Sequence, residues 1–325
     1  MALRFSTYRP IKTAPPSMVA TPTTNRKQDW IRPVLAIGLL VLIVWWVGPA
    51  EIWEAVRQTK PGYIALAVLL APGIWICLAK AWHPFTVDWG LGWTFNQTLR
   101  VVATAYASGI PTPGRVGEYA GRAAQVPKAF RSRALTSSFL TRAPGGFWMI
   151  LGGVIGLIGY GLPDQFNEHA ELVQVIYAAA VLSLLPTTIL ILPPNIWKFL
   201  SQKWKNPPPV ATELFELRTA LRFRIIAWAG LRYFIFSFQL ALLIAGASGL
   251  DLGSAMAIGL ITLMLKALIP DLSFAEVGIL NGLAGAVGFA YGLPSGPLVA
   301  ATILLGGINA GLLGILGAVL LVRKR

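Results

Sequence analysis

A chain of 325 residues that is 55% hydrophobic and only 12% charged, with a mean hydropathy of +0.65, does not fit a water-soluble protein. It indicates an all-α integral membrane protein built from apolar helices. The net charge of +14 does not indicate a nucleic-acid partner, because the basic residues lie mainly in loops beside apolar segments and no nucleic-acid-binding motif is present. The single cysteine, Cys77, excludes an intramolecular disulfide.

Several catalytic motifs are missing from the sequence. It contains no phosphate-binding G-x-x-x-x-G-K-[ST], no H-E-x-x-H, no G-x-S-x-G, no paired cysteines and no histidine cluster. An ATPase, a metalloprotease and a metal centre therefore have no support. We expect no cofactor and no metal.

The chain begins with a segment unlike the rest. Residues 1–32 are rich in proline, threonine and basic side chains and lack the apolar core of a cleavable signal, which predicts a disordered cytoplasmic tail. Residues 33–325 are predicted to form a single polytopic membrane domain.

About six apolar runs are predicted as full membrane spans of roughly 20 residues each. They are residues 33–48, 62–82, 134–161, 172–192, 225–249 and 297–322. Basic residues gather at 128–133 and 198–224, whereas the loop at 164–171 is acidic. By the positive-inside rule, both termini are cytoplasmic, as expected for a multi-pass protein of a bacterial inner membrane.

Two regions remain, residues 87–133 and 251–296. Each holds an apolar arm, a break with proline and a second apolar arm. The first begins and ends inside, and the second begins and ends outside. We interpret them as re-entrant helical hairpins of opposite orientation, as an inverted repeat predicts. Two full spans in each region are the alternative.

The two breaks read alike. Pro111 and Pro113 precede Glu118, and Pro270 precedes Glu276. A charged side chain at membrane depth costs free energy and is usually functional. Finding one beside each break predicts a site at the repeat interface.

The first break carries the more distinctive charges. Arg115, Glu118 and Arg122 share one face if a helix begins after Pro113. The two arginines are candidate donors to a lipid phosphate, with Glu118 orienting an arginine or contacting an amine. An ordinary cytoplasmic loop is the alternative. Arg142, in the next span, either reaches the interface or pairs with Glu118 or a lipid phosphate.

Lys266, Asp271 and Glu276 surround the second break and are candidate counter-charges or gating residues. A carboxylate near the outer interface is the alternative for Glu276. Arg100 and Arg232 lie in apolar arms and are weaker candidates, as salt-bridge partners.

These residues carry a resemblance to a known family. Pro113-Gly-Arg115-Val-Gly-Glu118 with the following Arg122, the later Arg142, and the late Ile-Pro…Glu-x-Gly element at Glu276 resemble the lysylphosphatidylglycerol synthase transmembrane-region family, also called flippase-like domain proteins. The resemblance runs from about residue 33 to residue 322. Bifunctional members of the family look like this membrane unit joined to a cytosolic aminoacyl-transfer domain, which we expect to be missing here.

The resemblance implies a flippase-like protein that moves a phospholipid or a polyprenyl-phosphate-type lipid between leaflets and is not an enzyme. The alternative is a non-transporting membrane subunit that anchors or regulates a lipid- or glycan-modifying enzyme. An intramembrane transferase is a minor alternative. A lipid-modifying partner enzyme and a homo-oligomer also stay open.

Overall fold

The computed structural model describes residues 49–110, 112, 115–161, 196, 199, 217–269 and 276–322, and every regular element within these ranges is a helix. The elements are α2 (Pro49–Gln58), α3 (Pro61–Asp88), α4 (Phe95–Gly109), α5 (Val116–Gln125), η4 (Lys128–Phe130), α6 (Arg131–Arg142), α7 (Pro144–Tyr160), α11 (Thr219–Ser248), α12 (Leu252–Ala267), α13 (Glu276–Ala290), α14 (Ser295–Gly306), η6 (Gly307–Leu312) and α15 (Leu313–Val322).

Four helical stretches are long and apolar enough to cross a membrane. They are Pro61–Asp88, Lys128–Tyr160, Thr219–Ser248 and Ser295–Leu320. They overlap four of the six predicted spans, so a multi-pass membrane protein is confirmed. The predicted spans at 33–48 and 172–192, like the predicted tail at 1–32, lie outside the described residues, and a count of six spans stays a prediction.

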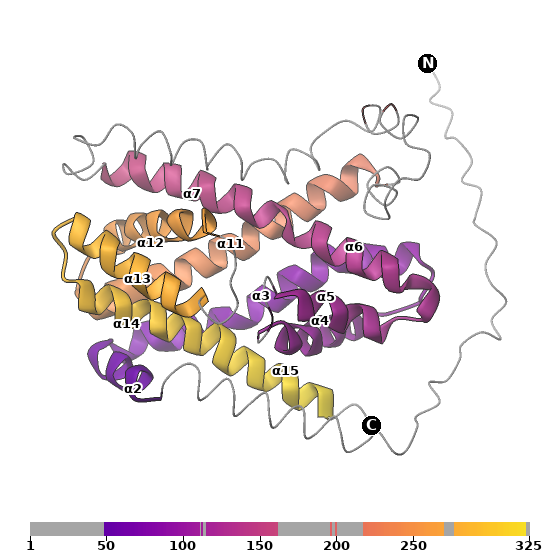
Figure 1. Ribbon diagram of the computed structural model, residues 1–325, viewed down its shortest axis with the longest axis horizontal. Coiled ribbons are helices and arrows are strands. Elements are labelled where there is room, and N and C mark those ends of the chain that lie inside the picture. Colours follow the sequence, from indigo (N-terminus) through magenta and orange to yellow (C-terminus); the bar gives the residue numbers. More distant parts are fainter. Residues whose placement is uncertain are drawn as a thin grey trace.

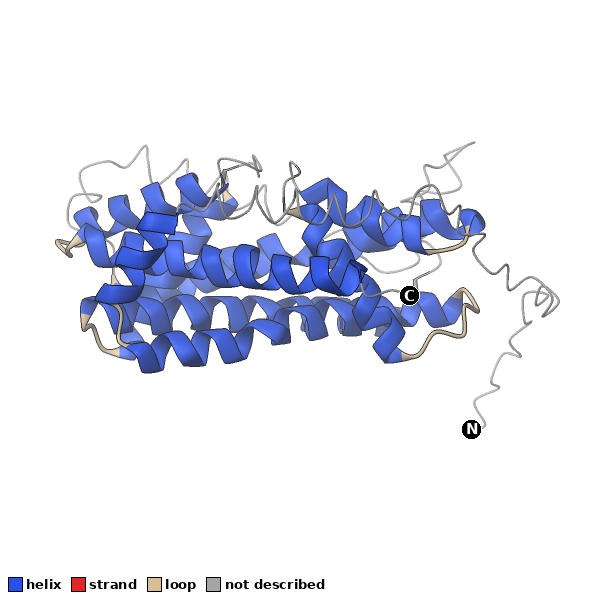
Figure 2. Cartoon of the chain, turned by 90° about the horizontal axis from the view of Figure 1, so that it is seen from below, coloured by secondary structure: helices blue, strands red, loops and turns tan. Residues whose placement is uncertain are grey.

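The short helices form two pairs at opposite ends of the bundle. Figure 1 shows α4 and α5 at one end and α12 and α13 at the other, while α3, α11 and the α14–α15 stretch run between the ends. Seen from below, the long helices lie along the length of the molecule in layers (Figure 2). This arrangement fits two hairpins of opposite orientation. Re-entrant insertion and an inverted repeat stay predictions.

Local sequence sets where the paired helices begin. The side chain of Thr94 accepts a hydrogen bond from the backbone N–H of Gln97, whose side chain accepts one from the N–H of Thr94, a capping box that starts α4. Asp251 accepts hydrogen bonds from the N–H groups of Gly253 and Ser254 and starts α12. Each pair is thus entered through a polar cap at its outer end.

Glycine lets the long helices approach closely. A Cβ atom on Gly153 of α7 would lie 2.2 Å from the Cβ of Met264 on α12, and one on Gly156 would lie 2.8 Å from the carbonyl oxygen of Ala257. On the other side of the bundle, a Cβ on Gly317 of α15 would lie 2.4 Å from the carbonyl oxygen of Ala103 on α4. Such close packing of small residues is typical of membrane helices.

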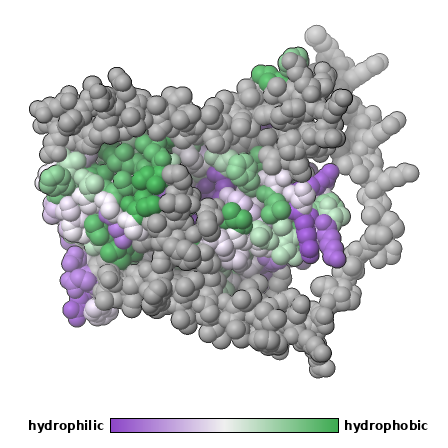
Figure 3. Space-filling model, in the orientation of Figure 1, coloured by the Kyte–Doolittle hydropathy of each residue, from purple (hydrophilic) through white to green (hydrophobic). Residues whose placement is uncertain are grey.

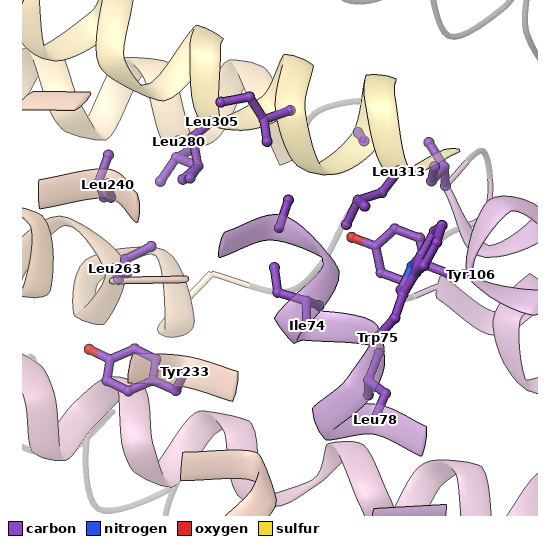
Figure 4. Close-up of a cluster of buried hydrophobic side chains, with 14 of the residues drawn as sticks. Ile74, Trp75, Leu78, Tyr106, Tyr233, Leu240, Leu263, Leu280, Leu305 and Leu313 are labelled. Atoms are coloured by element: carbon purple, nitrogen blue, oxygen red, sulfur yellow. The ribbon is translucent and has the colours of Figure 1, made fainter. Parts of the chain in front are cut away.

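The buried core is apolar and continuous along the bundle. Figure 4 shows Ile74, Trp75 and Leu78 of α3 between Tyr106 and Leu313 on one side and Leu240 and Leu263 on the other. Large apolar side chains also cover outward faces, Ile158 and Leu69 being 81% and 75% exposed. Figure 3 shows apolar surface over α12. Outward-facing apolar side chains suit a lipid environment.

Candidate functional site

The close contact of α4 and α5 builds the first break. A Cβ atom on Gly117 would lie 2.1 Å from the carbonyl oxygen of Ser108, and one on Gly121 would lie 3.1 Å from the Cα of Ala105. The Ser108 hydroxyl donates to the carbonyl of Gly117 at 2.9 Å, and the N–H of Gly117 donates to the Thr112 hydroxyl at 2.8 Å. Glycine therefore allows α5 to turn back along α4.

Arg115 adopts an unusual backbone conformation at this turn. Its φ of 56° and ψ of 31° are left-handed, and Arg115 is the one non-glycine residue with positive φ in the described part of the chain. This conformation costs roughly 1–2 kcal/mol for a residue with a Cβ. Arg115 therefore precedes α5 as its N-cap residue instead of lying on the helix face shared by Glu118 and Arg122. Its guanidinium carbon lies 5.0 Å from the centroid of the Tyr106 ring on α4.

Glu118 lies at the centre of the charged cluster and is completely buried. One carboxylate oxygen pairs with Arg122, one turn further along α5, and the other pairs with Arg142 at the end of α6. Arg122 is also fully buried, whereas the Arg142 side chain is 20% exposed. A single carboxylate thus holds two guanidinium groups from two helices.

The surroundings of Arg122 are aromatic and polar. Its guanidinium carbon lies 5.4 Å from the centroid of the Trp82 ring, and Trp82 donates to the Ser137 hydroxyl at 2.8 Å. Arg122 Nη1 makes a long contact of 3.5 Å with the Thr141 hydroxyl. The buried Nε atoms of Arg122 and Arg142 have no hydrogen-bond partner among the described residues. Each is therefore a spare donor inside the cluster.

Arg232, which the sequence ranked as a weaker candidate, belongs with this cluster. It lies within the 30-residue helix α11, and a Cβ built on Gly145 would be 3.0 Å from its Nη2 atom. Gly145 comes three residues after Arg142, so Arg232 reaches the junction of α6 and α7. Arg232 interacts electrostatically with Arg142, Glu118, Arg115 and Arg122. An arginine inside a long apolar helix is the signal that could have marked it.

Arg100, the other weaker candidate, lies exposed on α4.

The structure describes fewer of the candidate residues at the second break. Lys266 is partly buried in the last turn of α12, and Glu276 is the first residue of α13. The side chain of Glu276 lies outside the described residues, as do Pro270 and Asp271. Pro111 and Pro113 of the first break also lie outside them. The roles of these five residues therefore stay predictions.

A metal site was not expected. In the described ranges, no group of three histidine, cysteine, aspartate or glutamate side chains is placed to hold a metal ion.

A comparison with known families identifies the family of the chain. The family model described as the lysylphosphatidylglycerol synthase TM region matches residues 32–317, which include both breaks and all of the arginines discussed. No curated protein matches the chain. The resemblance predicted from the residues around Glu118 is confirmed. The chain therefore belongs to the lysylphosphatidylglycerol synthase transmembrane-region family, a membrane domain of the flippase-like kind.

Proposed function

We propose that this chain moves an anionic lipid, a phospholipid or a polyprenyl-phosphate-type lipid, between the two leaflets. Arg115, Arg122 and Arg142 bind the lipid phosphate, and the site has no catalytic role. The observation that carries the proposal is the buried Glu118 carboxylate, which holds Arg122 and Arg142 together at a helix break. Family membership supports the flippase-like part of the proposal.

The cluster has the chemistry of an anion site. Buried charges lose their hydration, and they are retained where a partner compensates them. Here one carboxylate serves two guanidinium groups, and the Nε–H of each has no partner among the described residues. Phosphate oxygens accept from arginine in a two-point geometry. A lipid phosphate would supply the missing acceptors.

The same carboxylate provides a means of switching. Glu118 ties α5 to α6 through its ion pair with Arg142. An incoming phosphate competes with the carboxylate for the arginines and loosens this tie, which lets the helices separate. We propose that Glu276 does the same at the second break, with Lys266 and Asp271 as further counter-charges, so that access alternates between faces.

In this proposal, the chain lies in a bacterial inner membrane with both termini in the cytoplasm. The α4–α5 pair then enters from the cytoplasmic side, where the exposed basic residues Lys128, Arg131 and Arg133 lie close in sequence to its end. By the positive-inside rule, these residues mark the cytoplasmic end of the bundle.

Exchange of labelled lipids in proteoliposomes tests the proposal. The native chain should exchange labelled lipid between leaflets, and folded Glu118→Gln should lose most of this activity. Arg131→Gln is the matched control, since it removes one charge from the exposed start of α6 and should leave the rate unchanged. Absence of exchange by the native chain for anionic, zwitterionic and polyprenyl lipids alike would contradict the proposal and favour the non-transporting subunit.

A further inference from the structure

We infer that the arginine cluster selects a lipid phosphate that carries two or more negative charges, a phosphomonoester or a diphosphate, over the singly charged phosphodiester of common phospholipids. We also infer that Arg232 is a fourth residue of this site. The inference rests on the proposed function for the location of the lipid site, and it goes further by naming the charge class of the headgroup.

The charge balance of the cluster carries the inference. Arg122 and Arg142 both pair with the carboxylate of Glu118, and Arg232 lies against Gly145, three residues beyond Arg142. Three positive charges against one negative charge leave an excess of two among the described residues. A phosphodiester would neutralise one of these charges, whereas a phosphomonoester near neutral pH neutralises close to two, and a diphosphate more. In a buried site, an uncompensated charge costs far more than at the surface.

The arginine N–H donors of the cluster suit the larger number of terminal oxygens on a phosphomonoester. A phosphomonoester has three terminal oxygens, whereas a phosphodiester has two free ones. Within the described ranges, the Nε–H groups of Arg122 and Arg142 have no hydrogen-bond partner, and Arg122 is fully buried. Because these donors come from two different helices, an anion with three acceptor oxygens can be reached by both and still accept from a third arginine.

Arg232 supplies that third direction. Arg122 comes from α5 and Arg142 from α6, whereas Arg232 comes from α11 and lies against Gly145 at the start of α7. Its position beside Arg142 places like charges close together, and the Glu118 carboxylate already pairs with Arg122 and Arg142. Two guanidinium groups approaching from opposing helices are held together most readily by an anion between them.

Equilibrium binding to the full chain in neutral phosphatidylcholine nanodiscs tests this. The probes are a polyprenyl monophosphate, phosphatidic acid, phosphatidylglycerol and inorganic phosphate. At pH 8 the two monoester lipids should bind at least about tenfold more tightly than phosphatidylglycerol. At pH 5.5 a monoester loses most of its second charge, since the second pKa of such a phosphate is about 6, and the preference should shrink severalfold. Equal affinity for phosphatidylglycerol and both monoester lipids at pH 8 would overturn the inference.

Variants of α11 separate the role of Arg232 from general effects of charge. Arg232→Gln should reduce the monoester preference by about tenfold, and Arg232→Lys should keep part of it. Arg224→Gln is the matched control, because Arg224 is exposed on the same helix. A full preference in folded Arg232→Gln would remove Arg232 from the site. If Arg232→Gln fails to fold, a reduced monoester preference in folded Arg232→Lys gives the same test, and a full preference there would remove Arg232 from the site.

The arms of the experiment also identify the source of the phosphate. Similar affinities for both monoester lipids would show that the site recognises the phosphate headgroup alone. A higher affinity for one of them would show that its hydrocarbon chain also contributes to binding. Binding of inorganic phosphate without either lipid would overturn a lipid site. Because binding is measured without transport, loss of leaflet exchange with an intact preference would remove the proposed function and leave this inference standing.

Discussion

Glu118 on α5 and Arg142 on α6 form an ion pair between residues 24 positions apart, and the carboxylate in this pair has no exposed surface. The pair joins the second arm of the α4–α5 hairpin to the stretch that continues into a candidate membrane span. Since the same carboxylate also holds Arg122, removing it would leave two guanidinium groups without their anion. This relationship links the stability of the hairpin to the proposed lipid-phosphate site.

The first prediction concerns stability. Glu118→Ala should lower the free energy of unfolding by about 3–5 kcal/mol, because it leaves buried positive charges unpaired. Thermal unfolding of purified protein in detergent measures this. A double-mutant cycle with Arg142→Gln should give a clear coupling energy between the two residues. Additive losses in the cycle would show that the pair contributes no coupling.

The second prediction concerns the contact between α4 and α5. Gly117→Ala places a Cβ 2.1 Å from the carbonyl oxygen of Ser108, so the two helices must separate. We therefore expect the free energy of unfolding to fall by about 1–3 kcal/mol. Lipid exchange should fall with it, because Glu118 follows one residue later. Gly159→Ala is the control, since nothing lies within 4 Å of a Cβ there. Equal thermal stability of the two variants would contradict this account of the turn.

The third prediction concerns the π-helical turn at η6 in the last candidate span. This turn, Gly307–Leu312, sets the register in which Gly317 meets Ala103 of α4. Inserting one alanine after Leu313, in the regular helix beyond this turn, should rotate the rest of α15 by about 100°, which moves Gly317 off that contact. We expect a marked loss of thermal stability, whereas Gly311→Ala, with open space around its Cβ, should be tolerated. An insertion variant as stable as the native chain would show that this register is not required.

The fourth prediction concerns pH and the cap of α12. The hydroxyl of Ser254 and the backbone N–H groups at the helix start hold the pKa of Asp251 below its ordinary value of 3.8. A lowered pKa means that the stabilisation is present at higher pH and is lost as the pH falls through the folded-state value. The stability difference between the native chain and Asp251→Ala should therefore be constant from pH 7 to 5 and shrink below about pH 4. A difference that stays constant to pH 2 would contradict this.

Much of the site could be predicted because its markers are local in sequence. Proline and glycine between two apolar arms predicted the first break, and Glu118 and Arg122 share the helix face that their spacing indicated. The conformation of Arg115 could not be predicted, because the tight return of α5 along α4 sets it, and the short spacing of charges carries no sign of that turn.

Contacts between residues far apart in the sequence could not be predicted either. The pairing of Arg142 with Glu118 was one of two alternatives, and packing of α6 against α5 selects it. Arg232 lies 90 residues beyond Arg142, and nothing in a single sequence places α11 beside the start of α7. The contact of Arg122 with Trp82 likewise depends on the packing of α3.

The most direct test of the central claim is the rate of lipid exchange by Arg142→Lys and Arg142→Gln in proteoliposomes, compared with native protein and Arg131→Gln. If this cluster binds the lipid phosphate during transport, Arg142→Gln should abolish exchange while remaining folded. Arg142→Lys should retain a part of the native rate, and Arg131→Gln should show the full native rate. Native rates in folded Arg142→Gln would contradict the claim that the cluster is the lipid site.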